Sequence, residues 1–265
     1  MRTVAQHAPI DYLLHLADNA IVLGQRNAEW CGHGPILEED LALANNALDL
    51  IGQARLLYQY VAERHNDGST EDTYAYFRDV PEFKNYTLLE LPHHGALVGY
   101  AIDNRDYAVT IARNFLYSAF MVLVWDKLAH SADAQLASIA AKSLKEARYH
   151  LRHAHDWLVR FGDGTDESHA RAQAALDHLW PYTQEFWTHS DFADAAAQAQ
   201  VGVDAKSVHD QWLAIVDATL AEATLKRPPD GGFVSTGKNG VHSEHLGFLL
   251  SEMQSLARAH PGATW

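Results

Sequence analysis

Cysteine is almost absent from the sequence, and among 265 residues the single example is Cys31. One thiol can form neither a disulfide within the chain nor a thiolate metal site. We expect Cys31 to be a half-buried structural thiol rather than a catalytic nucleophile. A chain so poor in cysteine is typical of the cytoplasm, which is the location we expect.

Long hydrophobic runs are also missing. The richest run, Phe115 to Val124, is shorter than the roughly 18 unbroken apolar residues of a membrane span. Residues 1–9 lack the apolar core that a signal peptide needs. We therefore expect no association with a membrane.

Positive charge is scarce. The chain has 20 Lys and Arg residues against 34 Asp and Glu residues, which gives a formal net charge of −14. Phosphate backbones are bound by clustered Lys and Arg side chains, so the composition argues against a nucleic-acid partner. A further interpretation is that part of the acidic surface faces a basic partner.

Strand patterns and common catalytic loops are absent from the sequence. It contains neither a Gly-x-x-x-x-Gly-Lys-Ser/Thr phosphate loop nor a Gly-x-Ser-x-Gly elbow. Ala, Leu, Gln and Glu recur instead, and the apolar residues have helical spacing. The sequence therefore predicts an all-α protein.

Four long and several shorter helices are expected. Pro181 should kink one of them, and Lys226 to Gly240 should form the longest loop. With no evident linker or repeat, we expect one helix bundle that comprises residues 1–265. The expected helices cover residues 9–30, 36–64, 72–78, 106–130, 131 or 133 to 161, 166–187, 205–225 and 243–260.

Two of the long helices have a regular apolar stripe. Apolar residues that step by three or four positions mark the helix face that is turned toward a core. In the second long helix the stripe is Leu37, Leu41, Ala44, Leu48, Ile51, Arg55 and Tyr58, and in the fourth it is Leu136, Ala140, Leu144, Ala147, Leu151, Ala154, Leu158 and Phe161.

A bundle of long helices can hold two metal ions in its core. The ferritin-like recipe takes one Glu from each of two helices and a Glu-x-x-His pair from each of the other two. Residues three apart share a helix face, and carboxylate with imidazole suits iron that activates oxygen. The sequence lacks both pairs, because Tyr149 follows Glu146 at this spacing and Gly52 follows Asp49.

The first and third long helices also depart from the recipe, since their expected inward positions offer amides and a cation. An arginine close to the site would repel a divalent cation. We therefore expect no metal, catalytic or cofactor-binding residue in this chain. The candidate residues of a degenerate di-iron site are Asn19, Asp49, Gly52, Arg113 (with Asn114), Glu146 and Tyr149, and their polar neighbours are Gln53, Arg55 and His150.

One histidine cluster offers an alternative metal site. Glu146, His150 and His153 step by four and three positions, so they share a helix face. They could bind zinc only if a second element completed the site. The simpler interpretation is a polar stripe, or buried groups that are hydrogen-bonded to a neighbouring helix.

Two other histidine pairs have no such pattern. His242 and His245 stand at the start of the last helix, where starting the helix or contacting a partner is the expected role. Their spacing is not that of a His-Glu-x-x-His metal motif. His93 and His94 follow Pro92 and are expected to face solvent.

Short strings over essentially the whole chain carry a family resemblance. They are EWCGHGP at 29–35, LEED at 37–40, LAN at 43–45, DLIGQAR at 49–55, RNFL at 113–116, KE at 145–146, YH at 149–150, GDGTDESH at 162–169, GVH at 240–242, EHLG at 244–247, EMQ at 252–254 and PGATW at 261–265. Any one string is a weak signal, but together they are specific. The chain resembles the C subunits of bacterial phenylacetyl-CoA epoxidase, also called ring 1,2-phenylacetyl-CoA monooxygenase.

This resemblance implies a ferritin-like fold and a role in aerobic phenylacetate degradation. It implies a complex with a homologous A subunit that carries the di-iron centre and binds phenylacetyl-CoA. That complex epoxidises the aromatic ring with dioxygen, and a flavin and iron–sulfur reductase subunit delivers the electrons. The C subunit is regarded as structural in this family, which agrees with the incomplete ligand set.

A buried carboxylate without a metal needs a counter-charge or hydrogen-bond donors. We therefore predict a network of polar side chains in place of the metal. In this network Glu146 and Asp49 pair with Arg113, Arg55, Tyr149 or Gln53.

A partner interface is expected on the first two long helices. The residues expected to anchor it are Trp30, Tyr58 and Tyr60.

Two other functions stay open at this point. One is a metal-binding ferritin-like oxidoreductase that uses Glu146, His150, His153 and Asp49 as unusual ligands. The other is a stand-alone helical binding protein without any oxygenase partner. The isolated chain could also form a homodimer.

Overall fold

The computed structural model describes residues 6–94 and 105–263. Over these ranges the chain is helical, with one isolated β-bridge between Thr236 and Val241. This confirms the all-α class. The chain groups into two compact units, Pro9–Leu91 with Ser235–Trp265 and Met1–Ala8 with Pro92–Val234. The single domain expected for residues 1–265 stays a prediction.

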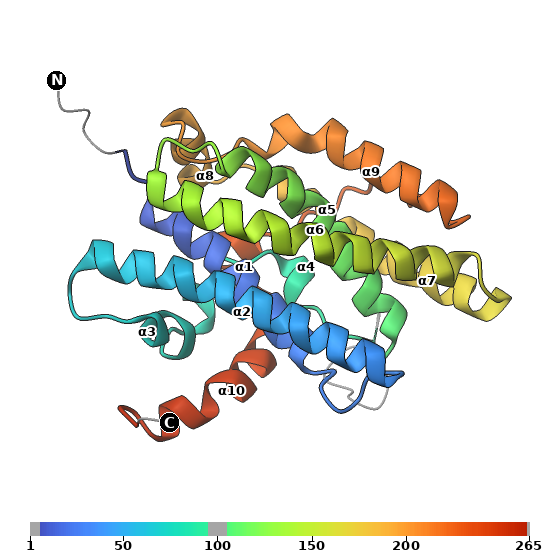
Figure 1. Ribbon diagram of the computed structural model, residues 1–265, viewed down its shortest axis with the longest axis horizontal. Coiled ribbons are helices and arrows are strands. Elements are labelled where there is room, and N and C mark those ends of the chain that lie inside the picture. Colours follow the sequence, from blue (N-terminus) through green and yellow to red (C-terminus); the bar gives the residue numbers. More distant parts are fainter. Residues whose placement is uncertain (1–5, 95–104, 264–265) are drawn as a thin grey trace. The chain divides into compact units, whose positions relative to one another are not determined.

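The first unit is built on a hairpin of two long helices, α1 (Ile10–Ala28) and α2 (Leu37–His65). They lie side by side and share the largest helix contact of this unit (Figure 1). Asn66 ends α2 in the left-handed conformation that commonly closes a helix. Both helices agree with the ranges expected from the sequence.

Shorter elements complete this unit. They are α3 (Glu71–Tyr76), the 3-10 turns η1 (Val80–Glu82) and η5 (Gly237–Asn239), α4 (Thr87–Glu90) and α10 (Glu244–Ala259). Helix α10, capped by Ser243 as expected, packs against α1, α3 and α4. Gly237 passes so close to α4 that an added Cβ would lie 2.6 Å from the Asn85 carbonyl oxygen. The segment around η5 can therefore lie on α4 because residue 237 has no side chain.

The apolar stripe expected to bury α2 lies on its outer side. Leu37 is 70% exposed, and Leu48 is 65% exposed. The buried face has other apolar residues, such as Leu43 and Leu50, and it packs on α1. The prediction of the buried face was wrong because α2 has apolar residues on two sides, and periodicity alone does not tell which side packs.

The structure also corrects the prediction that three aromatic residues anchor a partner interface. Trp30, Tyr58 and Tyr60 are all buried. Tyr58 makes its contacts inside the first unit, where its hydroxyl donates to Asp18 at 2.6 Å. These rings are part of the core and are not available to a partner.

A buried ion pair joins the two long helices of this unit to the chain that follows them. The Asp18 carboxylate on α1 is fully buried and accepts hydrogen bonds from the Arg78 guanidinium, from Tyr58 and from the Lys84 backbone N–H at 2.8 Å. The Arg78 guanidinium also lies 4.3 Å from the centre of the Phe83 ring. Burial, together with the Asp18 charge, raises the pKa of Tyr58, so its hydroxyl stays a donor.

A second buried cluster attaches the C-terminal segment. The Glu90 carboxylate accepts from His242 Nδ1 at 2.8 Å, from the Ser243 N–H at 2.6 Å and from Asn85 at 3.0 Å. His242 Nε2 lies 2.8 Å from the Phe83 carbonyl oxygen, so both ring nitrogens face acceptors. His242 stands directly before Ser243, the N-cap of α10, and joins this end of the helix to Glu90 and Phe83.

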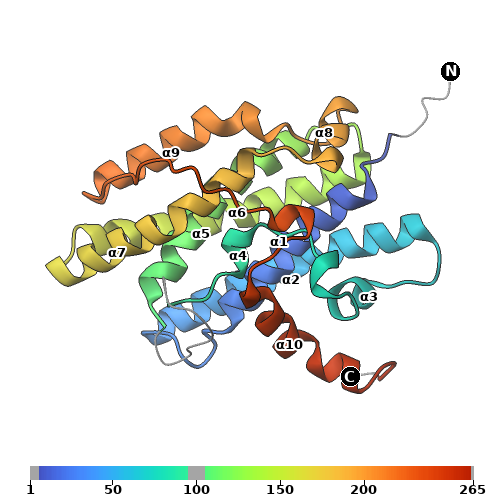
Figure 2. The same ribbon diagram turned by 180° about the vertical axis from the view of Figure 1, so that it is seen from behind.

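The second unit is built on the hairpin of α5 (Tyr107–Leu128) and α6 (Ala134–Gly162). Helix α7 (Asp166–Leu179) packs against both of them, as does α9 (His209–Glu222) (Figure 2). The smaller elements are η3 (Trp180–Trp187), α8 (Asp191–Gln198) and η4 (Ala205–Val208). The α-helix that begins at residue 166 ends at Leu179, and the 3-10 helix η3 continues through Pro181, where the sequence predicted a kink.

Local signals fix the ends of these helices. Asp106, Asp133 and Thr165 each accept a hydrogen bond from a backbone N–H of the helix that they begin. The end of α6 needs glycine, since a Cβ on Gly162 would lie 1.9 Å from the Ala223 carbonyl oxygen. Most of the apolar stripe expected for α6 is buried.

Helix α5 is the most apolar element of the chain. It is the one helix among the described residues that is long and apolar enough to cross a membrane, and 89% of its apolar window is buried. A mostly buried apolar helix is the pattern of a core element in a folded protein.

The buried Arg78–Asp18 pair should be important for stability. Arg78→Met leaves the Asp18 charge buried without its cation, and we expect a loss of about 3–5 kcal/mol in the free energy of unfolding. Urea denaturation followed by circular dichroism measures this loss. The matched control is Arg55→Met, because Arg55 pairs with Glu71 at the surface; its loss should stay below about 1 kcal/mol. Equal losses in the two variants would contradict the role given to the buried pair.

Candidate functional site

The candidate residues lie on two helix pairs, α1 with α2 and α5 with α6. On α1, Asn19 is fully buried. Its Oδ1 accepts from the Tyr86 backbone N–H at 2.8 Å, and its Nδ2 lies 3.3 Å from His15 Nε2. The amide therefore holds the beginning of α4 against α1, and its acceptor oxygen is already occupied.

His15 stands one turn before Asn19 and is held as the neutral ring. Its Nδ1 donates to the Lys84 carbonyl oxygen at 2.6 Å, which leaves Nε2 to accept from Asn19. Burial lowers the pKa of His15 to about 3. Near neutral pH the ring therefore stays neutral, and it links the Lys84 carbonyl oxygen to the Asn19 amide.

On α2 the buried polar residues include Asn46, which lies one turn before the expected Asp49. Asn46 and Gln53 are buried and Asp49 is half-buried. A Cβ added to Gly52 would meet no atom within 4 Å. The i, i+3 pair on the buried side is therefore Asn46 with Asp49, and Gly52 does not stand in a ligand position.

Arg55 is not a member of a buried network. Its side chain is largely exposed and pairs with Glu71 at 3.1 Å, and Gln59 donates to the same carboxylate oxygen at 2.9 Å. The predicted pairing of Arg55 with Glu146 or Asp49 is therefore wrong. Sequence spacing placed Arg55 on the stripe that the structure leaves exposed.

On α5, Arg113 is fully buried and holds the chain that enters this unit. Its Nη2 donates to His93 Nδ1 at 2.9 Å, and its Nη1 lies 3.5 Å from the Pro92 carbonyl oxygen. Thr110 Oγ1 lies 2.6 Å from the same His93 nitrogen. His93 and His94 are buried, which corrects the expectation that they face solvent.

On α6, the polar residues also differ from the expected arrangement. Glu146 is half-buried and lies 3.9 Å from Lys142, one turn earlier. Tyr149 is 40% exposed, with the Arg152 guanidinium over its ring, so it is not a buried member of the site. His150 and Ser143 are buried, and the i, i+3 pair on this side is Ser143 with Glu146.

The cysteine differs from its expected setting too. Cys31 is a free thiol on the surface and not a half-buried one. It lies in the turn after α1, where the backbone bends through Gly32 at a φ of 76°.

The donors on these helices do not fit a di-iron centre. The buried polar residues considered on these helices are the amides Asn19 and Asn46 in the first unit and Arg113 and the hydroxyl of Ser143 in the second. Amides and hydroxyls are weak iron ligands, and a buried guanidinium opposes a dication. Over residues 6–94 and 105–263, no three His, Cys, Asp or Glu side chains come together as a metal site.

Comparison with known proteins now identifies the family. The family model described as phenylacetic acid catabolic protein matches residues 1–265. The chain belongs to this family. Its ferritin-like helical fold is the one expected from the sequence, and family membership confirms the resemblance.

A curated member of this family is similar over nearly its whole length. It is the Escherichia coli (strain K12) protein named as the C subunit of 1,2-phenylacetyl-CoA epoxidase. The two chains are 44% identical over 254 residues, which are 96% of this chain and 98% of the relative. The name of the relative marks it as one part of an enzyme that has other subunits.

The buried neutral ring of His15 should make stability depend on pH. Its pKa is about 3 in the folded chain against 6.5 when exposed, so the unfolded chain binds more protons between these values. Stability is then complete above pH 6.5 and falls as the pH drops toward 3. Between pH 7 and pH 5 we expect His15 to account for about 2 kcal/mol of this loss.

Urea denaturation of the wild type and of His15→Asn at both pH values measures this contribution. The variant should lose less stability on acidification than the wild type. The exposed His260 provides the control, because His260→Asn should leave the wild-type pH dependence unchanged. Identical pH dependence in His15→Asn and the wild type would show that the ring does not resist protonation.

Proposed function

We propose that this chain is the C subunit of a 1,2-phenylacetyl-CoA epoxidase and that it supports the catalytic subunit without doing chemistry itself. The observation that carries the proposal is the similarity to the C subunit of the E. coli epoxidase along nearly the whole of both chains. The substrate class, phenylacetyl-CoA, comes from the name of that relative.

The non-catalytic role is supported by how this chain uses its candidate ligand positions. Asn19 fastens α4 to α1, and Arg113 fastens Pro92 and His93 to α5. A side chain that is fixed by such contacts cannot also coordinate a metal without breaking them. In this proposal the two side chains hold the fold of the subunit and bind no iron.

The complex that we propose divides the work between its subunits. A homologous A subunit holds the di-iron centre and the phenylacetyl-CoA, and a flavin and iron–sulfur reductase subunit supplies electrons. The present chain contributes a rigid surface that holds the helices of the A subunit in place. We place this complex in the cytoplasm, as part of aerobic phenylacetate degradation.

Iron analysis separates this function from that of a metalloenzyme. We expect near-zero iron in the chain purified alone and about two iron atoms per catalytic subunit after co-expression with the A subunit. The protein-bound iron would be quantified by elemental analysis after gel filtration.

The control for the iron measurement is a complex in which the present chain has the substitutions Asp49→Asn and Glu146→Gln. Its iron content should equal that of the wild-type complex, because neither carboxylate is an iron ligand. About two irons in the isolated wild-type chain would contradict the proposal and favour a metal-binding oxidoreductase. Failure of the wild-type chain to associate with the A subunit would favour a stand-alone binding protein.

A further inference from the structure

The outer side of α2 has leucines that no other part of the described chain covers. We call Leu37, Leu41, Leu48 and Ile51 the outer stripe; their exposures are 70%, 56%, 65% and 36%. With Ala44 they step by four and three residues along the helix, which is the spacing of a helix-pairing seam. An aligned row of large apolar side chains in water is the mark of an interaction surface.

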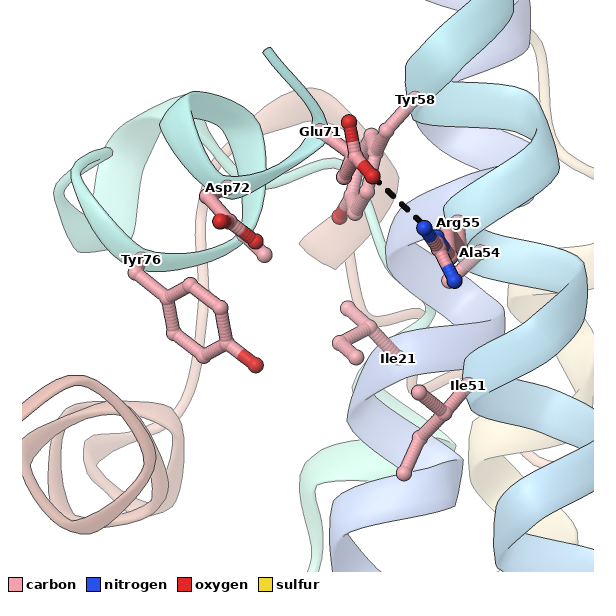
Figure 3. A pocket seen from close by; sticks show the side chains of 9 residues that line it. Ile21, Ile51, Ala54, Arg55, Tyr58, Glu71, Asp72 and Tyr76 are labelled. Carbon is pink, nitrogen blue, oxygen red and sulfur yellow. Dashed lines mark hydrogen bonds and ion pairs between the residues drawn. The ribbon is translucent and has the colours of Figure 1, made fainter. Parts of the chain in front are cut away.

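A cavity continues the outer stripe at its far end (Figure 3). Its volume is about 230 Å³, and Ile51 belongs both to the stripe and to the cavity wall. Ile21 and Ile51 form its apolar side, and Asp72 and Tyr76 of α3 face them from the other side. A side chain of a partner that lies along the stripe can therefore enter the cavity next to Ile51.

The charges around the stripe and the cavity are mostly negative. Glu38 is exposed beside the start of the stripe on α2, and Glu71 and Asp72 are at the cavity. Arg55, also at the cavity, is paired with Glu71. Burial and the Asp72 charge raise the pKa of Tyr76, as expected where a carboxylate acts on a neighbouring hydroxyl. This surface therefore favours an occupant with positive charge.

The charge also decides between two kinds of occupant. A second copy of this chain, with its net charge of −14, would bring an identical acidic rim against this one in a symmetric contact. Like charges that face each other across an interface are unfavourable. A different subunit, with Lys or Arg beside its apolar residues, would gain from the same rim.

We propose that the outer stripe and its cavity dock an amphipathic helix of the catalytic A subunit. This helix presents apolar side chains to Leu37, Leu41 and Leu48, and a Lys or Arg to the cavity beside Asp72. The inference rests on the proposed function, since it assumes an A subunit, and adds the surface and the chemistry of the contact. In this proposal the anchors of the partner interface are exposed leucines, and not the buried aromatic rings expected from the sequence.

The test measures the affinity of the full-length chain for its cognate A subunit by calorimetry. Leu41→Asp and Leu48→Asp should each weaken binding by about tenfold or more, as expected for residues at the centre of an interface. The matched control is Leu256→Asp on α10, because Leu256 is 56% exposed, as Leu41 is; its affinity should equal that of the wild type. Circular dichroism should show that all three variants are folded, as expected for surface substitutions.

A second measurement tests the charge of the occupant. Wild-type affinity should fall as salt is raised, and Asp72→Lys should weaken binding at low salt by about tenfold while reducing the salt dependence. Affinity that depends on neither salt nor residue 72 would overturn the basic character of the partner helix.

The outcomes distinguish the surface from the function. No binding of the wild-type chain to the A subunit would overturn the proposed function itself. Binding of the wild type that Leu41→Asp and Leu48→Asp leave unchanged would overturn the docking surface alone. A wild-type homodimer in analytical ultracentrifugation that Leu48→Asp dissociates would show that the occupant is a second copy, which also overturns this inference.

Discussion

A charge buried in a helical core has to be neutralised, and in this chain the neutralising groups come from the chain itself. Asp18 on α1 is held by Arg78, and Glu90 on α4 is held by His242 and the Ser243 N–H. Each of these contacts joins a helix to a segment far away in the sequence. Buried polar groups that would be costly alone thus fix how the connecting segments lie on the long helices.

Helix ends could be predicted from the sequence because their signals are local. Asp133 and Thr165 each supply the first hydrogen bond of the next helix, and Pro181 ends regular α-helix within its own turn. The helix faces were harder to predict. Helix α2 has leucines on two sides, and only packing against α1 shows that Leu43 rather than Leu41 is buried.

The candidate site shows the same limit. The loss of both Glu-x-x-His pairs could be read directly from the sequence. The register of the remaining polar residues could not, because it depends on which side of α2 and α6 is buried. For that reason Asn46 and Ser143 were not predicted as buried polar residues of the site. Gly52 and Tyr149 were predicted as site residues, but Gly52 has open space beside it and Tyr149 is exposed. Contacts such as Arg113 with His93 join residues 20 positions apart and have no local signal.

These features fit a subunit whose polar interior is structural and whose function lies at its surface. The buried polar side chains Asn19 and Arg113 are occupied with hydrogen bonds inside the chain. The outer side of α2, in contrast, has apolar side chains that a folded protein normally covers. This distribution supports the proposal that the chain holds a partner.

The most direct test of this account is the turnover of phenylacetyl-CoA by an epoxidase reconstituted with Asp49→Asn and Glu146→Gln in the present chain. If these carboxylates only support the fold, the variant complex should turn over substrate at the rate of the wild-type complex. A large loss of turnover, with the complex still assembled and its iron still in place, would show that this chain takes part in the chemistry.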